Sequence, residues 1–169
     1  MGSREAPVLV GMRGSGKSAV GARVAELLGL ELVDADAELE SRAGTSIAEI
    51  FESQGEQGFR RLEEELLLEV LRKTHVVIAT GGGAVLHESV RPLLRARLTF
   101  WLDGPLRLLA SRIASSDRPS LTGRSIVEEL DEVYRARRAL YEEVSKARID
   151  TEDLTVDEVA RRVCELSAQ

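Results

Sequence analysis

The octapeptide GMRGSGKS, from Gly11 to Ser18, fits the phosphate-loop pattern G-x-x-x-x-G-K-S/T and sets the architecture expected of this chain. The apolar run Pro7–Val10 precedes it, and the segment AVGARVAELLGL that follows has the period of a helix. An ordinary glycine turn that caps a helix is the alternative interpretation. The order of strand, glycine-rich turn and helix disfavours that alternative and predicts a phosphate loop.

A loop of this kind binds phosphate because its backbone N–H groups point inward and the helix dipole adds partial positive charge. Lys17 adds a full positive charge, so we expect a nucleoside triphosphate to bind here. The Ser18 hydroxyl is the expected ligand of Mg²⁺, a hard cation that prefers oxygen and takes few protein ligands beside the phosphates. The residues expected to contact the nucleotide are Gly14, Ser15, Gly16, Lys17, Ser18 and Ala19.

Length and composition indicate one domain spanning residues 1–169, with 43% hydrophobic and 31% charged residues. The net charge of −6, with only three Phe, two Tyr and one Trp, argues against a nucleic-acid partner. No apolar run approaches the ~20 residues that span a membrane, and MGSREAPVLV does not resemble a secretory signal. We therefore expect a cytoplasmic monomer.

Short apolar runs alternate with amphipathic stretches, which predicts an α/β fold with a parallel sheet. Capping boxes are expected to begin three helices, at Ser46 with Glu49, Ser125 with Glu128, and Thr155 with Glu158. Small and polar residues with both helix breakers predict a mobile loop over about 114–123. The strands are expected near residues 7–11, 31–34, 75–79, 97–102 and 147–150.

Two aspartates follow the second expected strand, in the sequence LVDADAELE. Because strand side chains alternate, Asp34 and Asp36 point the same way if the extended conformation persists. They would then face the edge of the sheet where ligands of open α/β folds collect, one beside the metal and one beside a substrate hydroxyl. A pair of turn or capping aspartates is the alternative. Asp103, which precedes Gly104 and Pro105, is expected instead to cap the next helix.

Three further features suit such a site. Gly81 to Gly83 would let a small ligand approach the backbone, although a bare turn is the alternative. Arg60 has the planar fork that matches a carboxylate, and Arg118 lies in the loop expected to move over the phosphates. By themselves, the two arginines would be a surface salt-bridge residue and an ordinary loop residue.

In combination these segments resemble shikimate kinase over nearly the whole chain. The resemblance implies a fold like that of nucleoside monophosphate kinases, with a five-stranded parallel sheet, a substrate-binding segment at about 34–63 and a lid at about 114–123. It also implies transfer of the γ-phosphoryl of ATP to the 3-hydroxyl of shikimate. The motifs are GMRGSGKS, DAD at 34–36, GTSIAEIFESQGEQGFRRLE, ATGGGAV at 79–85, DRP at 117–119 and RARRALY at 135–141.

The resemblance also implies a role for each matching residue. Lys17, Asp36 and Arg118 are the expected catalytic residues, and Arg112 and Arg118 join the phosphate loop in binding ATP. Ser18 and Asp34 are the expected Mg²⁺ residues. The expected shikimate-binding residues are Asp36, Arg60, Glu63, Gly81, Gly82, Gly83 and Arg138.

Two positions depart from the family pattern. Ala19 stands where threonine is usual, which removes a hydroxyl near the α-phosphate, and Ser120 replaces a leucine of the lid. Three other functions stay open at this point. One is a kinase of another small alcohol, such as gluconate or a nucleoside monophosphate, another is a kinase of a close shikimate analogue, and the third is a regulatory module that binds ATP without phosphoryl transfer.

Overall fold

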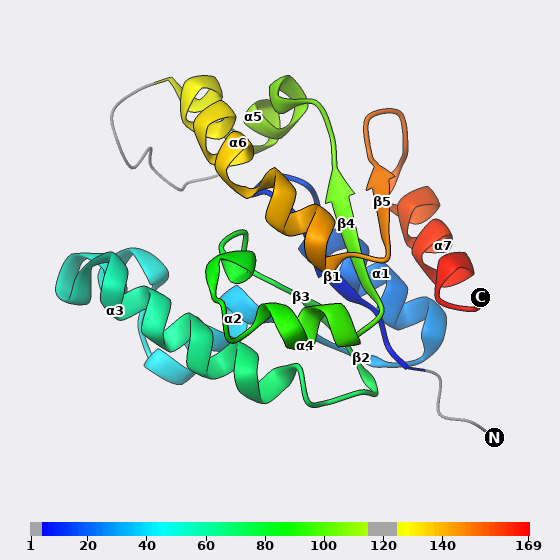
Figure 1. The fold of residues 1–169 in the computed structure, drawn as a ribbon, viewed down its shortest axis with the longest axis horizontal. Helices are drawn as coiled ribbons and strands as arrows, with labels where there is room; N and C mark the ends of the chain where they lie inside the picture. The colour runs from blue at the N-terminus through cyan, green and yellow to red at the C-terminus, as the bar shows by residue number, and fades with distance from the viewer. Residues whose placement is uncertain (1–4, 115–124) are drawn as a thin grey trace.

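Residues 5–114 and 125–169 are described by the computed structural model, and within them five strands form one parallel sheet (Figure 1). The strand order is β2-β3-β1-β4-β5, and every neighbouring pair is parallel. The predicted strands are confirmed, with small shifts at the ends of three of them. Their bounds are β1 Val8–Val10, β2 Glu31–Asp34, β3 Val76–Ala79, β4 Thr99–Asp103 and β5 Ala147–Asp150.

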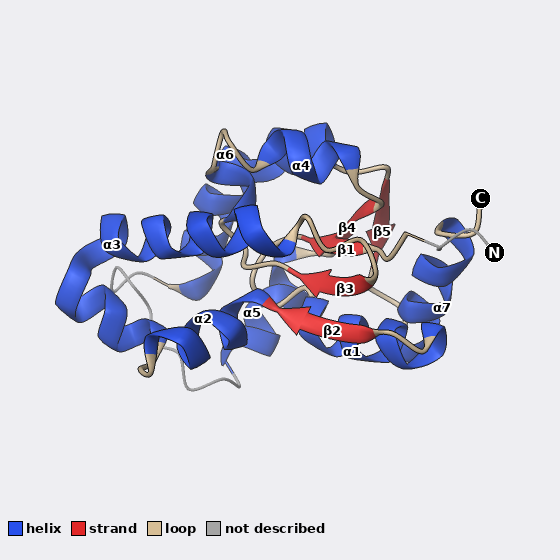
Figure 2. Cartoon of the chain, turned by 90° about the horizontal axis from the view of Figure 1, so that it is seen from below, coloured by secondary structure: helices blue, strands red, loops and turns tan. Residues whose placement is uncertain are grey.

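Helices cover both faces of this sheet (Figure 2). Helices α1 and α7 lie on one face, and α3, α4 and α6 lie on the other. The helices are α1 Lys17–Leu28, α2 Ala35–Ala43, α3 Ile47–Val70, α4 Arg91–Ala96, α5 Leu106–Ala114, α6 Ile126–Val144 and α7 Val156–Leu166, and a short 3-10 helix, η1, spans Ala84–Leu86.

Alternate residues of the central strand serve the two faces. Val8 and Val10 of β1 pack into the core beneath α3, α4 and α6, whereas Leu9 packs into the core beneath α1 and α7. This is the period of two expected of a strand buried on both sides. Trp101 of β4 is fully buried and stacks on Tyr141 of α6, with 5.6 Å between the ring centroids. This contact fixes α6 against the sheet.

The helix starts largely follow the predicted caps. Ser46 and Thr155 each form a complete capping box with the glutamate three residues later. Ser125 forms one half of a capping box, in which its hydroxyl accepts a hydrogen bond from the Glu128 N–H. The Glu128 carboxylate accepts from the Ser125 hydroxyl instead of from its backbone N–H. Helix α3 contains a break at Gly55, whose φ of 68° and ψ of −177° are not helical.

The prediction that Asp103 caps the next helix is wrong. Its side chain is buried, accepts a 3.1 Å hydrogen bond from the Tyr134 hydroxyl and pairs with Arg148 Nε at 2.8 Å. The Arg148 guanidinium also lies over the Trp101 ring, 5.2 Å from its centroid. Asp103 therefore joins β4, β5 and α6 instead of starting α5. In the described part of the chain, no helix has both the length and the apolar character needed to cross a membrane.

Candidate active site

The phosphate loop joins β1 to α1 and is held by its own lysine. Lys17 Nζ donates to the carbonyls of Gly11 and Met12, at 2.9 and 2.8 Å. Gly16 precedes α1 with a φ of 90°, a left-handed conformation that favours glycine. The first N–H groups of α1, which lack partners within the helix, therefore open toward the loop. The loop has the shape and charge to receive an anion.

The candidate metal residues lie together beside this loop. The Ser18 hydroxyl donates to Asp34 Oδ2, and Asp34 Oδ1 accepts from the N–H of Ala37 at 3.2 Å. Asp34 is thus both the last residue of β2 and the N-cap of α2. The extended conformation does not persist through Asp36, because the chain turns helical at Ala35, and Asp34 has the capping role that was the alternative.

This pair of oxygen ligands suits Mg²⁺, which usually takes only one or two protein ligands and fills its other positions with phosphate and water. Among the described residues, no group of three or more His, Cys, Asp or Glu side chains could hold a metal on its own. A hydroxyl and a carboxylate next to an anion cradle therefore fit a metal that arrives with a nucleotide.

Gly81, in the turn after β3, lies between two carboxylates that come from different helices. A Cβ placed on Gly81 would be 2.7 Å from Glu63 Oε1 and 2.9 Å from Asp36 Oδ1. Asp36 lies in the first turn of α2 and Glu63 in the second half of α3. The first helical turn of α2, and not an extended segment, therefore brings Asp36 next to Glu63. A side chain at this position would force one or both carboxylates to shift.

Glu63 is almost fully buried, with 2% of its surface exposed, yet it has two charged or polar partners. Its Oε2 atom accepts from Arg60 Nη1 at 2.6 Å and lies 2.9 Å from His87 Nε2. Burial raises the pKa of this carboxyl, but the hydrogen bonds and charges of His87 and Arg60 outweigh burial and hold the pKa below its ordinary value. Glu63 is therefore a buried anion at neutral pH.

Arg60 passes so close to Gly83 that a Cβ there would collide with its guanidinium. The Arg60 side chain lies over the Phe59 ring, 5.2 Å from the centroid, and its Nε is 3.6 Å from Glu56 Oε1. These contacts and the bond to Glu63 orient the guanidinium toward the glycine turn. Arg60 thus lies against the glycine turn while it also forms ion pairs with Glu56 and Glu63.

The middle glycine of the turn, Gly82, faces α6. The Tyr141 hydroxyl donates to the Gly82 carbonyl at 2.6 Å, and burial raises the pKa of Tyr141 to about 12. A Cβ on Gly82 would be 3.6 Å from Arg137 Nη1, whereas Arg138 is 56% exposed and pairs with Glu142. The structure therefore brings Arg137 to the turn, and it does not bring Arg138 there.

Two nucleotide residues expected outside the loop have different outcomes. Arg112, in the last turn of α5, donates to the Gly14 carbonyl at 3.2 Å, so it borders the phosphate loop. Arg118 lies outside the described residues, as does most of the expected lid. Ala19 is exposed in the first turn of α1, next to Ser18.

The sequence contains a signal for the position of Arg137. Tyr141 is four residues after Arg137, so the two share one face of α6, and an aromatic residue at that spacing marks the buried face. Arg138 is displaced by about 100° around the helix. The sequence contained no comparable signal for His87, because its role depends on where the segment after η1 meets α3.

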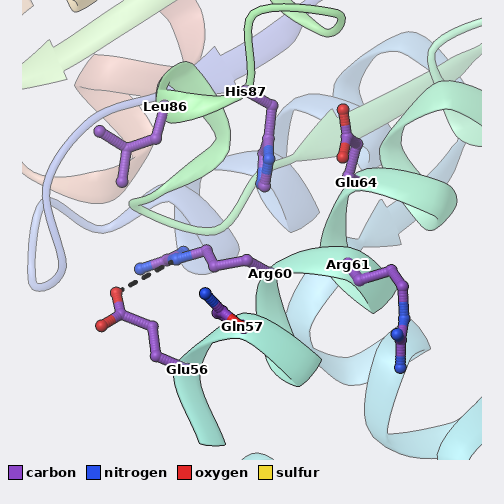
Figure 3. Close-up of a pocket in the computed structure, with 7 residues that line it drawn as sticks. All are labelled: Glu56, Gln57, Arg60, Arg61, Glu64, Leu86 and His87. Atoms are coloured by element: carbon purple, nitrogen blue, oxygen red, sulfur yellow. Dashed lines mark ion pairs between the residues drawn. The ribbon is translucent and has the colours of Figure 1, made fainter.

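A cleft of about 480 Å³ lies on the outer side of Arg60. Figure 3 shows Arg60 and His87 extending into this region from α3 and from the segment after η1. The lining residues are Glu56, Gln57, Arg60, Arg61, Glu64, Leu86 and His87. The site is therefore bordered by charged side chains on its outer side.

Comparison with known proteins shows which family this chain belongs to. The sequence model of the family described as shikimate kinase matches residues 13–167. A shikimate kinase of Rhodopirellula baltica is 40% identical over 161 residues, which cover 92% of this chain and 86% of the relative. A bifunctional shikimate kinase/3-dehydroquinate synthase of Thermotoga maritima is 42% identical over 146 residues, which cover 86% of this chain. The match spans only 29% of that longer protein.

Solved structures agree with this result. The shikimate kinase of Acinetobacter baumannii in complex with shikimate superposes with a TM-score of 0.91 at 35% identity, covering 96% of this chain and 92% of that one. A gluconokinase of Sinorhizobium meliloti has a TM-score of 0.60 at 18% identity, covering 98% and 93%, so it shares the fold alone. The fold, the match over most of the sequence and the relatives of similar length together show that this chain belongs to the shikimate kinase family.

Proposed function

We propose that this chain transfers the γ-phosphoryl group of ATP to the 3-hydroxyl of shikimate, giving shikimate 3-phosphate and ADP. The observation that carries the proposal is the glycine turn 81–83, which is surrounded by two carboxylates and two arginines and lies beside a phosphate loop. Such a surface complements a small ring that bears a carboxylate and several hydroxyls.

On the nucleotide side, Lys17 and the N–H groups at the start of α1 bind the β- and γ-phosphates. Ser18 and Asp34 would hold Mg²⁺, which would supply positive charge to the phosphate oxygens. Arg112 borders the loop and is our candidate for contact with the adenine. Arg118, outside the described residues, is our candidate for the lid arginine that stabilises charge in the transition state.

On the substrate side, Arg60 and Arg137 approach the glycine turn from α3 and α6 and are our candidates for binding the carboxylate of shikimate. Arg137 replaces Arg138 in this role because it is the arginine beside Gly82. Asp36 and Glu63, which lie beside Gly81, are our candidates for binding the ring hydroxyls. Asp36 then orients the 3-hydroxyl and accepts its proton as the phosphoryl group is transferred.

Catalysis under this proposal consists mainly of positioning and charge stabilisation, because phosphoryl transfer passes through a loose transition state. Fixing the acid at one end and its hydroxyl at the other supplies up to ~7–11 kcal/mol by proximity and orientation in favourable cases. The acidic composition, with a net charge of −6, supports a small-molecule substrate over nucleic acid. We further propose that the chain acts as a monomer in the cytoplasm.

The test is an ADP-release assay with ATP, Mg²⁺ and one acceptor at a time. Shikimate is compared with its amino and deoxy analogues, with gluconate, and with no acceptor. We expect release that depends on shikimate and exceeds release with gluconate by orders of magnitude. Release without any acceptor dependence would indicate a nucleotide-binding module, and equal rates with gluconate would contradict the proposed substrate.

A further inference from the structure

His87 connects the segment after the glycine turn to the buried carboxylate of α3. Its imidazole Nε2 lies 2.9 Å from Glu63 Oε2, and only 9% of the residue is exposed. The backbone of His87 is also fixed, because its carbonyl accepts from the N–H groups of Val90 and Arg91 at 3.1 and 3.2 Å. His87 is therefore a rigid support for Glu63 and not a mobile surface side chain.

The two oxygens of Glu63 have different surroundings. Oε2 accepts from Arg60 and meets His87, whereas Oε1 lies on the side of Gly81 and Asp36. A carboxylate with one oxygen bound twice cannot rotate without losing both bonds. His87 and Arg60 together therefore keep Oε1 toward the proposed substrate.

The protonation state of this contact follows from chemistry. Glu63 is ionised at neutral pH, as its lowered pKa indicates, so its oxygens only accept hydrogen bonds. His87 Nε2 must then carry a hydrogen atom and donate a hydrogen bond to Glu63. Other charged groups surround the imidazole. Arg60 and Glu63 contact each other, and the same cleft is lined by Glu56, Arg61 and Glu64. The guanidinium of Arg91 donates to backbone carbonyls.

We infer that His87 is a positioning residue for substrate binding, which acts through Glu63 and Arg60 without touching the substrate. The inference rests on the proposed function. His87 fixes Glu63, which faces the ring hydroxyls. Because Glu63 is also the ion-pair partner of Arg60, the same hydrogen bond helps to fix the arginine that faces the substrate carboxylate. Removing the Nε2 donor therefore loosens both ends of the substrate site while the phosphate loop, on a different segment, keeps its geometry.

The experiment compares His87→Leu and His87→Gln with the wild-type chain. The Leu variant lacks the donor, and we expect its KM for shikimate to rise about tenfold, the order associated with one lost hydrogen bond to a charged group. Its KM for ATP should stay within about twofold. The Gln variant places an amide N–H near the position of Nε2, so we expect it to restore most of the shikimate affinity.

His75 provides the matched control, because it is the other histidine of the chain and is exposed in the turn before β3. His75→Leu should leave both Michaelis constants within about twofold of wild type. An unchanged KM for shikimate in His87→Leu would overturn the inference. Equal increases for shikimate and ATP in a folded His87→Leu variant, with no recovery in His87→Gln, would overturn it too, because the effect would then not be specific to the substrate site.

A spectroscopic readout decides the matter if the Leu variant does not fold. In wild-type protein, ¹⁵N shifts of the two imidazoles should identify His87 as protonated on Nε2 at neutral pH, and His87→Gln supplies the assignment. A proton on Nδ1 alone would refute the inference. Wild-type protein that does not turn over shikimate would refute the proposed function, whereas normal turnover without any effect of His87 would refute only the role of this residue.

Discussion

Replacing Gly81 by alanine tests how tightly the two carboxylates enclose the glycine turn. The new methyl group would be 2.7 Å from Glu63 Oε1 and 2.9 Å from Asp36 Oδ1, well inside the ~3.5 Å separation of unstrained non-bonded atoms. Glu63 cannot move away freely, because Arg60 and His87 hold its other oxygen and the residue is buried. Overpacking of this kind typically costs ~1–3 kcal/mol of folding free energy.

Gly82→Ala is the matched control. A Cβ at Gly82 has its nearest neighbours at 3.4 and 3.6 Å, which is ordinary van der Waals contact. Both substitutions remove one glycine from the unfolded chain, so this entropic effect cancels when the two variants are compared. We therefore expect Gly81→Ala to be less stable than Gly82→Ala by ~1–3 kcal/mol.

Urea unfolding measures this difference, with the fluorescence of the single, buried tryptophan, Trp101, as the signal. With slopes of ~1–3 kcal/mol per molar urea, the midpoint of Gly81→Ala should lie roughly 1 M below that of Gly82→Ala. Equal midpoints would show that Glu63 and Asp36 can withdraw at little cost, and the argument that this position requires glycine would then be refuted.

The remaining predictions concern the arginines, the proposed base and one helix cap. Arg137→Ala should raise the KM for shikimate tenfold or more, since a charged hydrogen bond is lost, whereas Arg138→Ala should change it less than twofold; the reverse result would return the role to Arg138. Asp36→Asn should lower kcat by at least a hundredfold and leave the Kd for ATP nearly unchanged, which single-turnover and nucleotide-binding measurements separate. Hydrogen bonds from the Thr45 hydroxyl and from Ser46 lower the pKa of Glu49 to about 2. The stabilising contribution of Glu49 is therefore present above pH 4.5 and is lost as the pH falls toward 2. A carboxyl ¹³C titration should show this midpoint, and Thr45→Ala should raise it; a midpoint near 4.5 in wild type would contradict the cap.

The strands and the phosphate loop could be predicted from the sequence because both depend on local patterns. Strands 31–34 and 147–150 were predicted with the bounds that the structure has, and the strand before the phosphate loop was predicted to within one residue at each end. The capping boxes at Ser46 and Thr155 were likewise confirmed, because a cap involves residues only three apart.

Local patterns were insufficient where two conformations compete. The sequence left open whether the chain stays extended from Asp34 to Asp36 or Asp34 caps a helix, and in the structure the Asp34 side chain accepts from the N–H of Ala37 and begins α2. Asp103 was expected to cap α5, but Tyr134 and Arg148 reach it from elements that follow much later in the chain. Nothing within a few residues of Asp103 indicates these partners.

The side chains around the glycine turn show the same limit. Arg60 and Gly83 could be named from the sequence, but their close approach depends on how α3 packs against the turn after β3. His87 and Arg137 were not predicted as site residues, since each acts through a contact with a distant element. Packing in three dimensions, and not local preference, decides such contacts.

Tyr141 has a consequence for anyone who seeks a more heat-resistant form of this chain. One face of its ring is committed to Trp101 in the interior, while its hydroxyl holds the carbonyl of Gly82. Selection for thermal endurance would tolerate Tyr141→Phe, because the ring stack on Trp101 survives. The substitution would nevertheless remove the hydrogen bond that holds the Gly82 carbonyl. A screen for thermal endurance should therefore score turnover in the same round, because survival of heat alone does not report the loss of this hydrogen bond.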